Sequence, residues 1–221
     1  MPALAAVCLA VIVGLLARRL RVSQRPARAL IVSSPRSTVI AGDGAVRSVQ
    51  SARLTMSTAD LDRIWVPDNL ENLGRTYWRF LSRVTLGLVR VSYTQSERAV
   101  VALGFITLLR FTAPEYVVEP LRGRVSWPIK DGLLVAKTGH GCGWLCLDVQ
   151  RKPSAGNPSA EAEVTIDVEV ANFYPAIASG LSMFVYEITQ AFVHVLVTHA
   201  FLRSLAKLDL AESKVGRLRD A

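Results

Sequence analysis

The residues with the clearest chemical potential lie in the stretch KTGHGCGWLC, residues 137–146. It brings His140, Cys142 and Cys146 within seven positions, and imidazole and thiolate groups are the ligands that zinc prefers. Two nearby cysteines also suit redox chemistry, while three interspersed glycines suit a phosphate-binding loop or a hairpin tip. The flanking segments decide among these possibilities.

The flanking segments favour the hairpin tip. Residues 144–150 alternate in the manner of a strand, and residues 133–137 are predicted to form the neighbouring strand. A phosphate-binding loop would instead be followed by a helix. On an extended strand Cys142 and Cys146 would lie about 13 Å apart, too far for a shared zinc ion or a disulfide. We therefore expect no metal site, and a turn in which residues 139, 141 and 143, all glycine, adopt positive φ angles.

His199 is the second chemical candidate. It lies in a segment, residues 178–207, whose apolar residues recur with helical spacing. The predicted stripe comprises Leu181, Val185, Ile188, Phe192, Val195, His199 and Leu202. Its one strongly polar member, His199, is either a structural histidine hydrogen-bonded in the core, or a ligand contact or acid–base group in a cavity.

The remaining sequence offers no constellation for catalysis. No acid pair, Ser-His-Asp order or clustered ligand set is visible, so we assign no catalytic residue, no metal and no cofactor. A further stripe of the same segment is more apolar than contact with water favours. It predicts cover by another part of the chain, a second copy or a membrane surface. This possible homodimer face comprises Tyr186, Val193, Val197 and Ala200.

The net charge of +8 is concentrated near the start of the chain. Six arginines precede Asp43, the first acidic residue: Arg18, Arg19, Arg21, Arg25, Arg28 and Arg36. The remaining domain is nearly balanced, so we expect no nucleic-acid partner. With 51% hydrophobic residues, the 221-residue chain has ample material for a core. Its three cysteines form no disulfide pattern and fit a reducing compartment.

Residues 2–17 carry no charge, and the basic sequence RRLR follows them. A helix of this length spans about 24 Å, slightly less than the ~30 Å hydrocarbon core of a bilayer. A signal peptide would have its positive charge before the apolar run. Charge after the run favours a single-pass anchor with the N-terminus outside and the main domain cytoplasmic. The alternatives are an apolar helix docked on the domain and a misassigned start codon.

The hydrophobic period changes along the chain in an informative order. Residues 45–56 predict a strand, two short helices follow up to residue 84, and about six antiparallel strands come next. Asp131-Gly132 is a strong two-residue hairpin turn, and the long helical segment comes last. No βαβ alternation appears, so a parallel sheet is disfavoured. A curved antiparallel sheet must bury its apolar face, and the long helix is the largest element left to cover it.

This order, with the phrases RVSWPIKDGLLV and VEVANFYPAI before the last helix, resembles the helix-grip fold of the SRPBCC superfamily. That superfamily includes the START, Bet v 1 and polyketide cyclase families. The resemblance implies an α+β fold, with a curved antiparallel sheet of about six to seven strands wrapped on a long C-terminal helix, plus an N-terminal apolar helix. It also implies a hydrophobic cavity between sheet and helix that serves lipid or small-molecule binding.

The chain accordingly divides into an anchor helix (1–19), a basic linker with one possible strand (20–44), a helix-grip domain (45–207) and a polar tail (208–221). Candidate ligand contacts come from the inward faces of the strands, the second short helix and the long helix. They are Trp78, Tyr93, Phe105, Thr107, Trp127, Ile188, Phe192, Val195 and His199.

Three functions compete on this basis. The first is a membrane-tethered binding domain for a lipid or another apolar small molecule. The second is a cyclase or hydrolase that uses His199 with Tyr93 or Thr107 in the cavity. The third is a structural, dimerising protein associated with a membrane.

Overall fold

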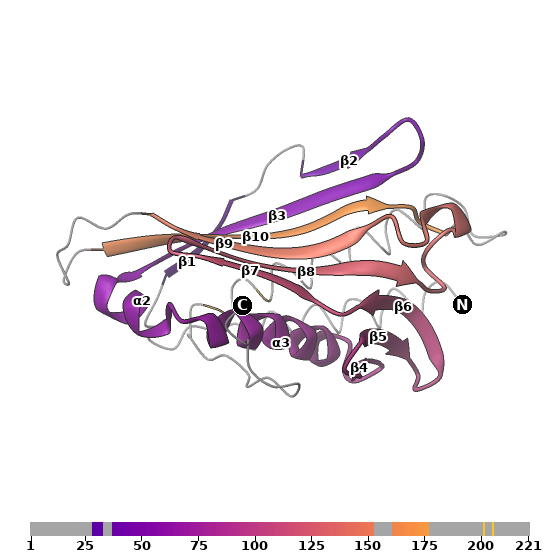
Figure 1. Ribbon diagram of the computed structural model, residues 1–221, viewed down its shortest axis with the longest axis horizontal. Coiled ribbons are helices and arrows are strands. Elements are labelled where there is room, and N and C mark those ends of the chain that lie inside the picture. Colours follow the sequence, from indigo (N-terminus) through magenta and orange to yellow (C-terminus); the bar gives the residue numbers. More distant parts are fainter. Residues whose placement is uncertain (1–27, 33–36, 153–160, 177–200, 202–204, 206–221) are drawn as a thin grey trace, which may run out of the picture.

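The computed structural model describes residues 28–32, 37–152, 161–176, 201 and 205. In these ranges the chain forms one antiparallel sheet with two α-helices along one face, an α+β arrangement (Figure 1). The predicted class and the antiparallel sheet are confirmed. The long C-terminal helix and the N-terminal apolar helix of the prediction lie outside the described residues, apart from Phe201 and Leu205.

The sheet runs in the order β1-β3-β10-β9-β8-β6-β5-β4, with β2 also paired to β3 and β7 to β8. The strands are β1 (Arg28–Val32), β2 (Thr38–Ile40), β3 (Val46–Ser57), β4 (Val89–Tyr93), β5 (Glu97–Ala102), β6 (Ile106–Thr112), β7 (Glu115–Glu119), β8 (Arg122–Asp131), β9 (Trp144–Arg151) and β10 (Glu161–Phe173). The described residues thus contain ten strands, more than the six to seven expected. Two of them, β1 and β2, lie inside residues 20–44, for which a linker with one possible strand is predicted.

Both helices begin where the sequence predicts. Helix α2 (Thr58–Ile64) is capped by Ser57, whose hydroxyl accepts a hydrogen bond from the Asp60 backbone N–H at 3.1 Å. Helix α3 (Pro67–Val84) starts at a proline, which lacks the N–H that a first helical turn leaves unpaired anyway. The two helices lie end to end beneath the sheet (Figure 1).

Residues 98–112, RAVVALGFITLLRFT, lie in the region where about six strands are predicted, and they form a hairpin of β5 and β6. Its turn has Leu103 at φ 51° and Gly104 at φ 85°, the left-handed pair typical of a type I′ turn. Leucine is not a residue type that favours turns, so the sequence does not predict that the chain reverses direction here. The expectation that Phe105 faces the interior is wrong, because its side chain is exposed, as is that of Leu103.

The connection from β8 to β9 also differs from the prediction. Asp131-Gly132 does not close a two-residue hairpin, and residues 133–137 form no strand. The chain runs through a short 3₁₀ helix, η1 (Lys137–Gly139), before β9 begins. The backbone N–H groups of Leu133 and Leu134 donate to the carbonyls of Thr107 and Leu108 at 3.1 and 3.0 Å. This connection therefore pairs with the start of β6, and so it cannot pair with β9.

Two glycines let α3 lie close to the inner face of the sheet. A Cβ atom on Gly74 would lie 2.8 Å from the indole ring of Trp127 on β8. A Cβ atom on Gly123, also on β8, would lie 3.4 Å from the Leu70 side chain of α3. Because a real Cβ contact is almost never below 3 Å, Gly74 is the position at which helix and sheet meet most tightly.

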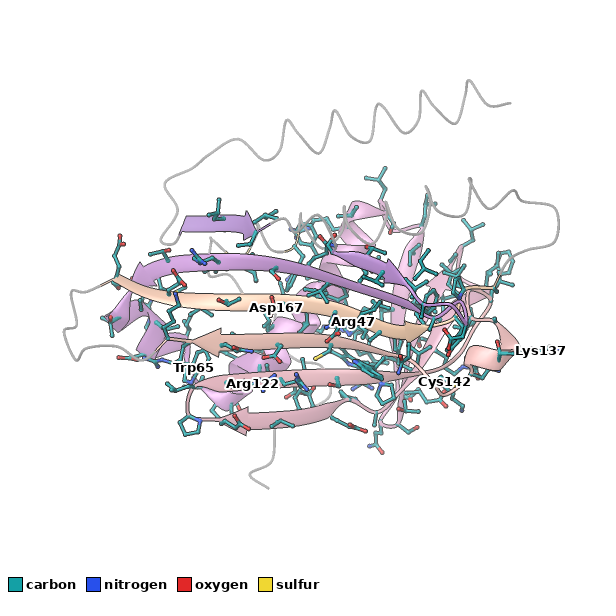
Figure 2. All side chains as sticks on the ribbon, turned by 90° about the horizontal axis from the view of Figure 1, so that it is seen from above. Arg47, Trp65, Arg122, Lys137, Cys142 and Asp167 are labelled. Atoms are coloured by element: carbon teal, nitrogen blue, oxygen red, sulfur yellow. The ribbon has the colours of Figure 1, made fainter. Side chains whose placement is uncertain are left out.

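The outer face of the sheet is polar and carries ion pairs (Figure 2). At its centre Asp148 on β9 has a side chain only 10% exposed, between Arg122 and Arg124 of β8. Its carboxylate accepts from Arg122 Nε at 3.0 Å and from Arg124 Nη2 at 2.8 Å. Burial alone would raise the pKa of Asp148, but the hydrogen bonds from both arginines outweigh it and lower this pKa below its ordinary value.

We predict that Asp148→Asn lowers the free energy of unfolding by about 1–3 kcal/mol at neutral pH, because hydrogen bonds to a charged group are lost. Since the folded-state pKa is depressed, this contribution is present above the unfolded pKa and disappears as pH falls through the folded pKa. Urea unfolding of both proteins at neutral and acid pH measures it. An equal difference at both pH values would contradict the assignment.

Candidate functional site

A cavity of about 130 Å³ lies between the inner face of the sheet and the two helices. The sheet contributes apolar side chains from β3, β9 and β10, and the helices contribute leucines and an isoleucine from α2 and α3. These wall residues are Leu54, Met56, Leu61, Ile64, Leu70, Leu73, Val149, Val164, Ile166 and Leu205. With the exception of Ile64, each of them is buried. The wall is therefore apolar, as the walls of ligand cavities typically are.

The sequence pattern contains the wall, although it does not identify it. On β10 every second residue faces inward, as strand alternation predicts, and Val164, Ile166 and Val168 are buried. Leu54 and Met56 lie opposite this face on β3, since Leu54 pairs with Val164 and Met56 with Ala162. Alternation shows which side chains face inward, but it does not show where helices leave them uncovered. None of these wall residues is therefore among the ligand contacts predicted from the sequence.

The cavity ends at the junction between α2 and α3, where Trp65, Val66 and Pro67 join its lining. Across from them lie Val118 and Glu119 of β7 and Arg122 of β8. Val66 and Val118 are about half exposed, and Glu119 is exposed. This mixture of exposed apolar and charged side chains marks the rim of the cavity.

Trp65 joins the two sides of the rim. Its indole N–H donates to the carbonyl of Pro120, in the β7–β8 turn, at 3.0 Å. The guanidinium of Arg151 lies 5.4 Å from the centre of the Trp65 ring and pairs with Asp62 of α2 at 2.8 Å. Trp65 thus ties the helical junction to the end of the sheet.

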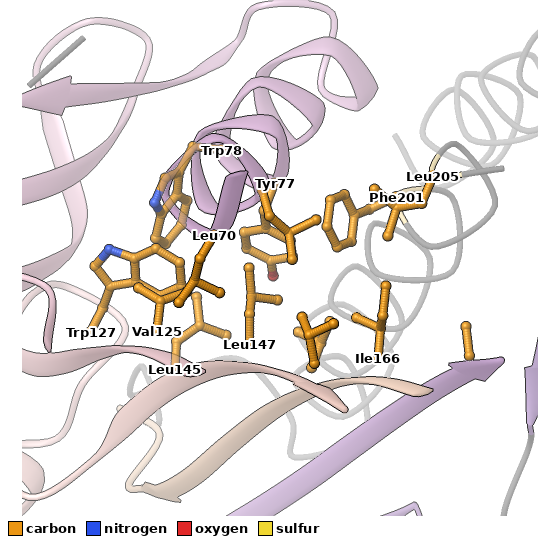
Figure 3. Packing of buried hydrophobic residues seen from close by; sticks show 14 of the residues in the cluster. Leu70, Tyr77, Trp78, Val125, Trp127, Leu145, Leu147, Ile166, Phe201 and Leu205 are labelled. Atoms are coloured by element: carbon orange, nitrogen blue, oxygen red, sulfur yellow. The ribbon is translucent and has the colours of Figure 1, made fainter. Parts of the chain in front are cut away.

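Of the predicted ligand contacts, Trp78 and Trp127 lie side by side in the packed core between α3 and β8 (Figure 3). Their ring centres are 5.1 Å apart in an edge-to-face arrangement, and Phe111 lies 5.4 Å from Trp78. The buried Trp78 indole N–H has no hydrogen-bond partner among the described residues. Neither tryptophan lines the cavity.

Tyr93 lies in a polar cluster beside α3 and is half-buried. The guanidinium carbons of Arg75 and Arg98 are 4.1 and 5.2 Å from its ring centre. Burial raises the pKa of Tyr93 although both arginines oppose the shift. Burial and the nearby Glu71 raise the pKa of Tyr116 to about 12. Both phenols therefore keep their protons near neutral pH, so neither can accept a proton there as a general base.

The other predicted contacts are dispersed. Phe105 is 77% exposed next to the β5–β6 turn, and Thr107 is half-buried at the start of β6. The four candidates of the predicted long helix lie outside the described residues: Ile188, Phe192, Val195 and His199. The same holds for the possible homodimer face of Tyr186, Val193 and Val197. Their roles stay predictions.

Two residues from the end of the predicted helix are described, and both are buried. The Phe201 ring packs edge-to-face on Tyr77 of α3 with 5.2 Å between ring centres (Figure 3). Leu205 contributes to the cavity wall. Neither residue belongs to the predicted stripe that contains His199, so neither contact is predicted by the helical spacing.

The stretch KTGHGCGWLC forms η1, the loop after it and the start of β9. Cys142 is exposed and Cys146 is buried. Burial raises the pKa of the Cys146 thiol, which keeps it protonated and poorly nucleophilic. Across the described ranges, no three His, Cys, Asp or Glu side chains come close enough to hold a metal ion.

The three glycines of this stretch serve different purposes. Only Gly141 has the predicted positive φ, at 73°. A Cβ atom on Gly139 would lie 2.5 Å from the Tyr174 side chain, and one on Gly143 would lie 2.7 Å from the Asn172 carbonyl oxygen. Gly139 and Gly143 are thus sites of close approach to the end of β10 and the residue after it, a contact that the local sequence does not reveal.

No protein-family model and no curated protein matches this chain. Solved structures that are similar include an uncharacterised protein from Bacillus thuringiensis, with 13% identity and a TM-score of 0.39, covering 74% of this chain and 99% of that one. Human STARD10 has 9% identity and a TM-score of 0.32, covering 85% and 71%. Human StAR-related lipid transfer protein 5 has 13% identity and a TM-score of 0.29, covering 94% and 99%.

START-type proteins are thus among the similar structures. At these identities and TM-scores the similarity assigns neither a family nor a ligand to this chain. No helix within the described ranges is long and apolar enough to cross a membrane, and residues 2–17 lie outside those ranges.

We predict that Trp65→Phe loosens the rim, because phenylalanine cannot donate to the Pro120 carbonyl. The bond is exposed, so the expected loss in unfolding free energy is only about 0.5–1 kcal/mol. Amide hydrogen exchange should become faster in residues 118–122 and leave the centre of β10 unchanged. Trp144→Phe, at a half-buried tryptophan remote from the rim, is the control. Equal exchange in both variants would show that Trp65 does not hold the rim.

Proposed function

We propose that this protein binds an apolar small molecule, or the apolar end of a lipid, in the cavity between the sheet and helices α2 and α3. The observation that carries the proposal is an apolar cavity of about 130 Å³ bordered by the buried hydrophobic cluster. Close-packed interiors contain few voids larger than a water molecule, and an apolar void offers water no hydrogen-bond partners. Such a space favours an apolar occupant.

The size of the cavity limits the ligand. An engineered apolar cavity of about 150 Å³ accommodates benzene, so this cavity suits a single ring or a short length of acyl chain. A larger lipid would have to leave most of its length outside the wall. The rim offers Glu119 and Arg122 to a polar end of the ligand, whereas the side-chain amide of Asn69 already donates to the Ile64 carbonyl at 2.8 Å. Arg122 is already paired with Asp148, which leaves it less able to bind an anionic group.

Tethering to a membrane through residues 2–17 is the second part of the proposal. Sixteen uncharged residues followed by RRLR support it, with the N-terminus outside and the main domain cytoplasmic. Such a tether would keep the binding domain close to a store of apolar ligands.

We predict that Val164→Phe fills the cavity, removes bound apolar ligand and costs little stability, because the larger ring enters existing space. Val168→Phe is the matched control, since Val168 lies on the same face of β10, is fully buried and does not line the cavity. It should lower the free energy of unfolding by about 1–3 kcal/mol through overpacking. Thermal unfolding and native mass spectrometry of the full chain measure both effects.

Two outcomes would contradict the binding proposal. The parent protein could release no apolar molecule on denaturation and bind no solvatochromic apolar dye. Alternatively, Val164→Phe could destabilise as much as Val168→Phe, which would indicate a close-packed site. Either result would favour a structural role for the domain.

We also predict that the full chain stays with membranes after alkaline extraction, whereas a chain without residues 1–19 is released. Alkaline treatment removes peripheral proteins, so retention reports insertion rather than surface contact. A protease added to intact cells should leave a cleavable tag at the C-terminus uncut, and it should cut the tag only after the cells are broken open, because the C-terminus is then on the cytoplasmic side. Release of both chains, or cleavage of the tag in intact cells, would contradict the proposed anchor.

A further inference from the structure

One end of the domain displays a cluster of exposed large apolar side chains. We call it the apolar tip and define it by Leu86, Leu88, Leu103, Phe105 and Leu133, which are between 57% and 77% exposed. They come from the α3–β4 loop, the β5–β6 turn and the residues after β8. The backbone N–H of Leu103 donates to the Leu88 carbonyl at 2.9 Å and so joins the first two segments; the N–H of Leu133 donates at 3.1 Å to the carbonyl of Thr107, which follows the β5–β6 turn in β6. The tip is thus one surface.

Two of these leucines adopt a conformation that leucine disfavours. Leu86 has φ 53° and Leu103 has φ 51°, and each is followed by a glycine that also has a positive φ. The third non-glycine residue with a positive φ among the described residues is Asn172, a residue type that tolerates this region. Asparagine or glycine would suit both leucine positions better, in conformation and in solubility. Strained apolar residues that face solvent indicate a contact surface.

The charge around the tip indicates which surface it contacts. Residues 79–90 contain Arg79, Arg83 and Arg90 and no acidic residue, and residues 102–109 contain no charge at all. The three arginines are exposed. Asp131, which precedes the third segment, is paired with Arg110 at 3.4 Å. An apolar end bordered by unopposed arginines is complementary to a bilayer with anionic headgroups.

We propose that the apolar tip inserts into the headgroup region of an anionic membrane, with Arg83 and Arg90 against the lipid phosphates. The cavity lies at the opposite end of α3, because Pro67 and Leu70 line it and the tip follows Val84. Eighteen helical residues span about 27 Å. A domain docked through the tip therefore holds the cavity rim away from the bilayer that it contacts.

The test uses the full chain, in which Cys8→Ser and Cys142→Ser remove competing thiols. The substitution Phe105→Cys then provides the attachment point for an environment-sensitive fluorophore. Vesicles of phosphatidylcholine, with and without phosphatidylglycerol, are added. We expect the emission to shift to the blue and to rise about twofold or more with anionic vesicles, because the probe leaves water. A probe on Val117→Cys, an exposed apolar position on the outer face of β7, should not change. This control separates tip insertion from attachment through residues 2–17.

The double variant Leu86→Asn, Leu103→Asn replaces two apolar side chains of the tip and reduces the backbone strain at the two positive φ angles. This variant should lose the fluorescence change and melt at the same temperature as the parent or higher, so misfolding cannot explain the loss. Arg83→Gln with Arg90→Gln should remove the difference between the two kinds of vesicle.

Three results would overturn the proposal: no response at position 105, equal responses at positions 105 and 117, or an unchanged response in the leucine variant. A change that follows protein concentration without lipid would assign the tip to a second copy instead. None of these measurements involves the cavity ligand, so they stand apart from the binding proposal.

Discussion

The close approach of α3 to the inner face of the sheet is the constraint on which the other features depend. Gly74 gives the Trp127 ring room against the helix, and Trp78 of the same helix stacks edge-on against that ring. Tyr77 extends the aromatic contact to Phe201. Because α3 is held at its middle by these large rings, its position relative to the sheet is fixed, and both of its ends acquire defined surroundings.

The two ends of α3 differ in what covers them. At its N-terminal end the short helix α2 and the junction at Trp65 bridge to the β7–β8 turn without filling the space beneath them, which leaves the apolar cavity. At its C-terminal end the chain turns sharply at Leu86 and Gly87 into β4. There the apolar side chains of the tip are mostly exposed to solvent. A binding cavity and a contact surface can thus both result from how one helix is placed.

On the outer face of the sheet, neighbouring strands are joined by ion pairs between side chains rather than by apolar packing. Asp148 is shielded by the two arginines that bind it, and Glu169 and Arg47 pair across β10 and β3 at 2.6 Å. Such pairs satisfy polar groups along the strands without contributing a large apolar surface. This division leaves the inner face to the core and the cavity. It places Arg124, Asp148 and Glu169 away from the cavity, while Arg122 reaches its rim.

The local sequence pattern alone determined the starts of the two helices, the alternation of β10 and the α+β class. The cap at Ser57, the proline that starts α3 and the strict alternation of β10 each act within a few residues, so the sequence predicted these elements and the α+β class correctly. The β5–β6 turn was missed because Leu103 adopts a left-handed conformation that its side chain does not signal. Gly139 and Gly143 were misread because the atoms that require glycine there belong to Tyr174 and Asn172, about thirty residues away.

The site depended on tertiary structure even more strongly. Alternation places Val164 and Ile166 on the inner face, but a cavity is a space that packing leaves unfilled, and no single segment encodes it. Trp78, Trp127, Leu70 and Val149 are all apolar and buried. Only Leu70 and Val149 line the cavity, whereas the two tryptophans pack in the core, and the sequence cannot distinguish these two cases. Sequence determined which side chains face inward, while the placement of α2 and α3 decided where they leave room, because volume depends on contacts between distant segments.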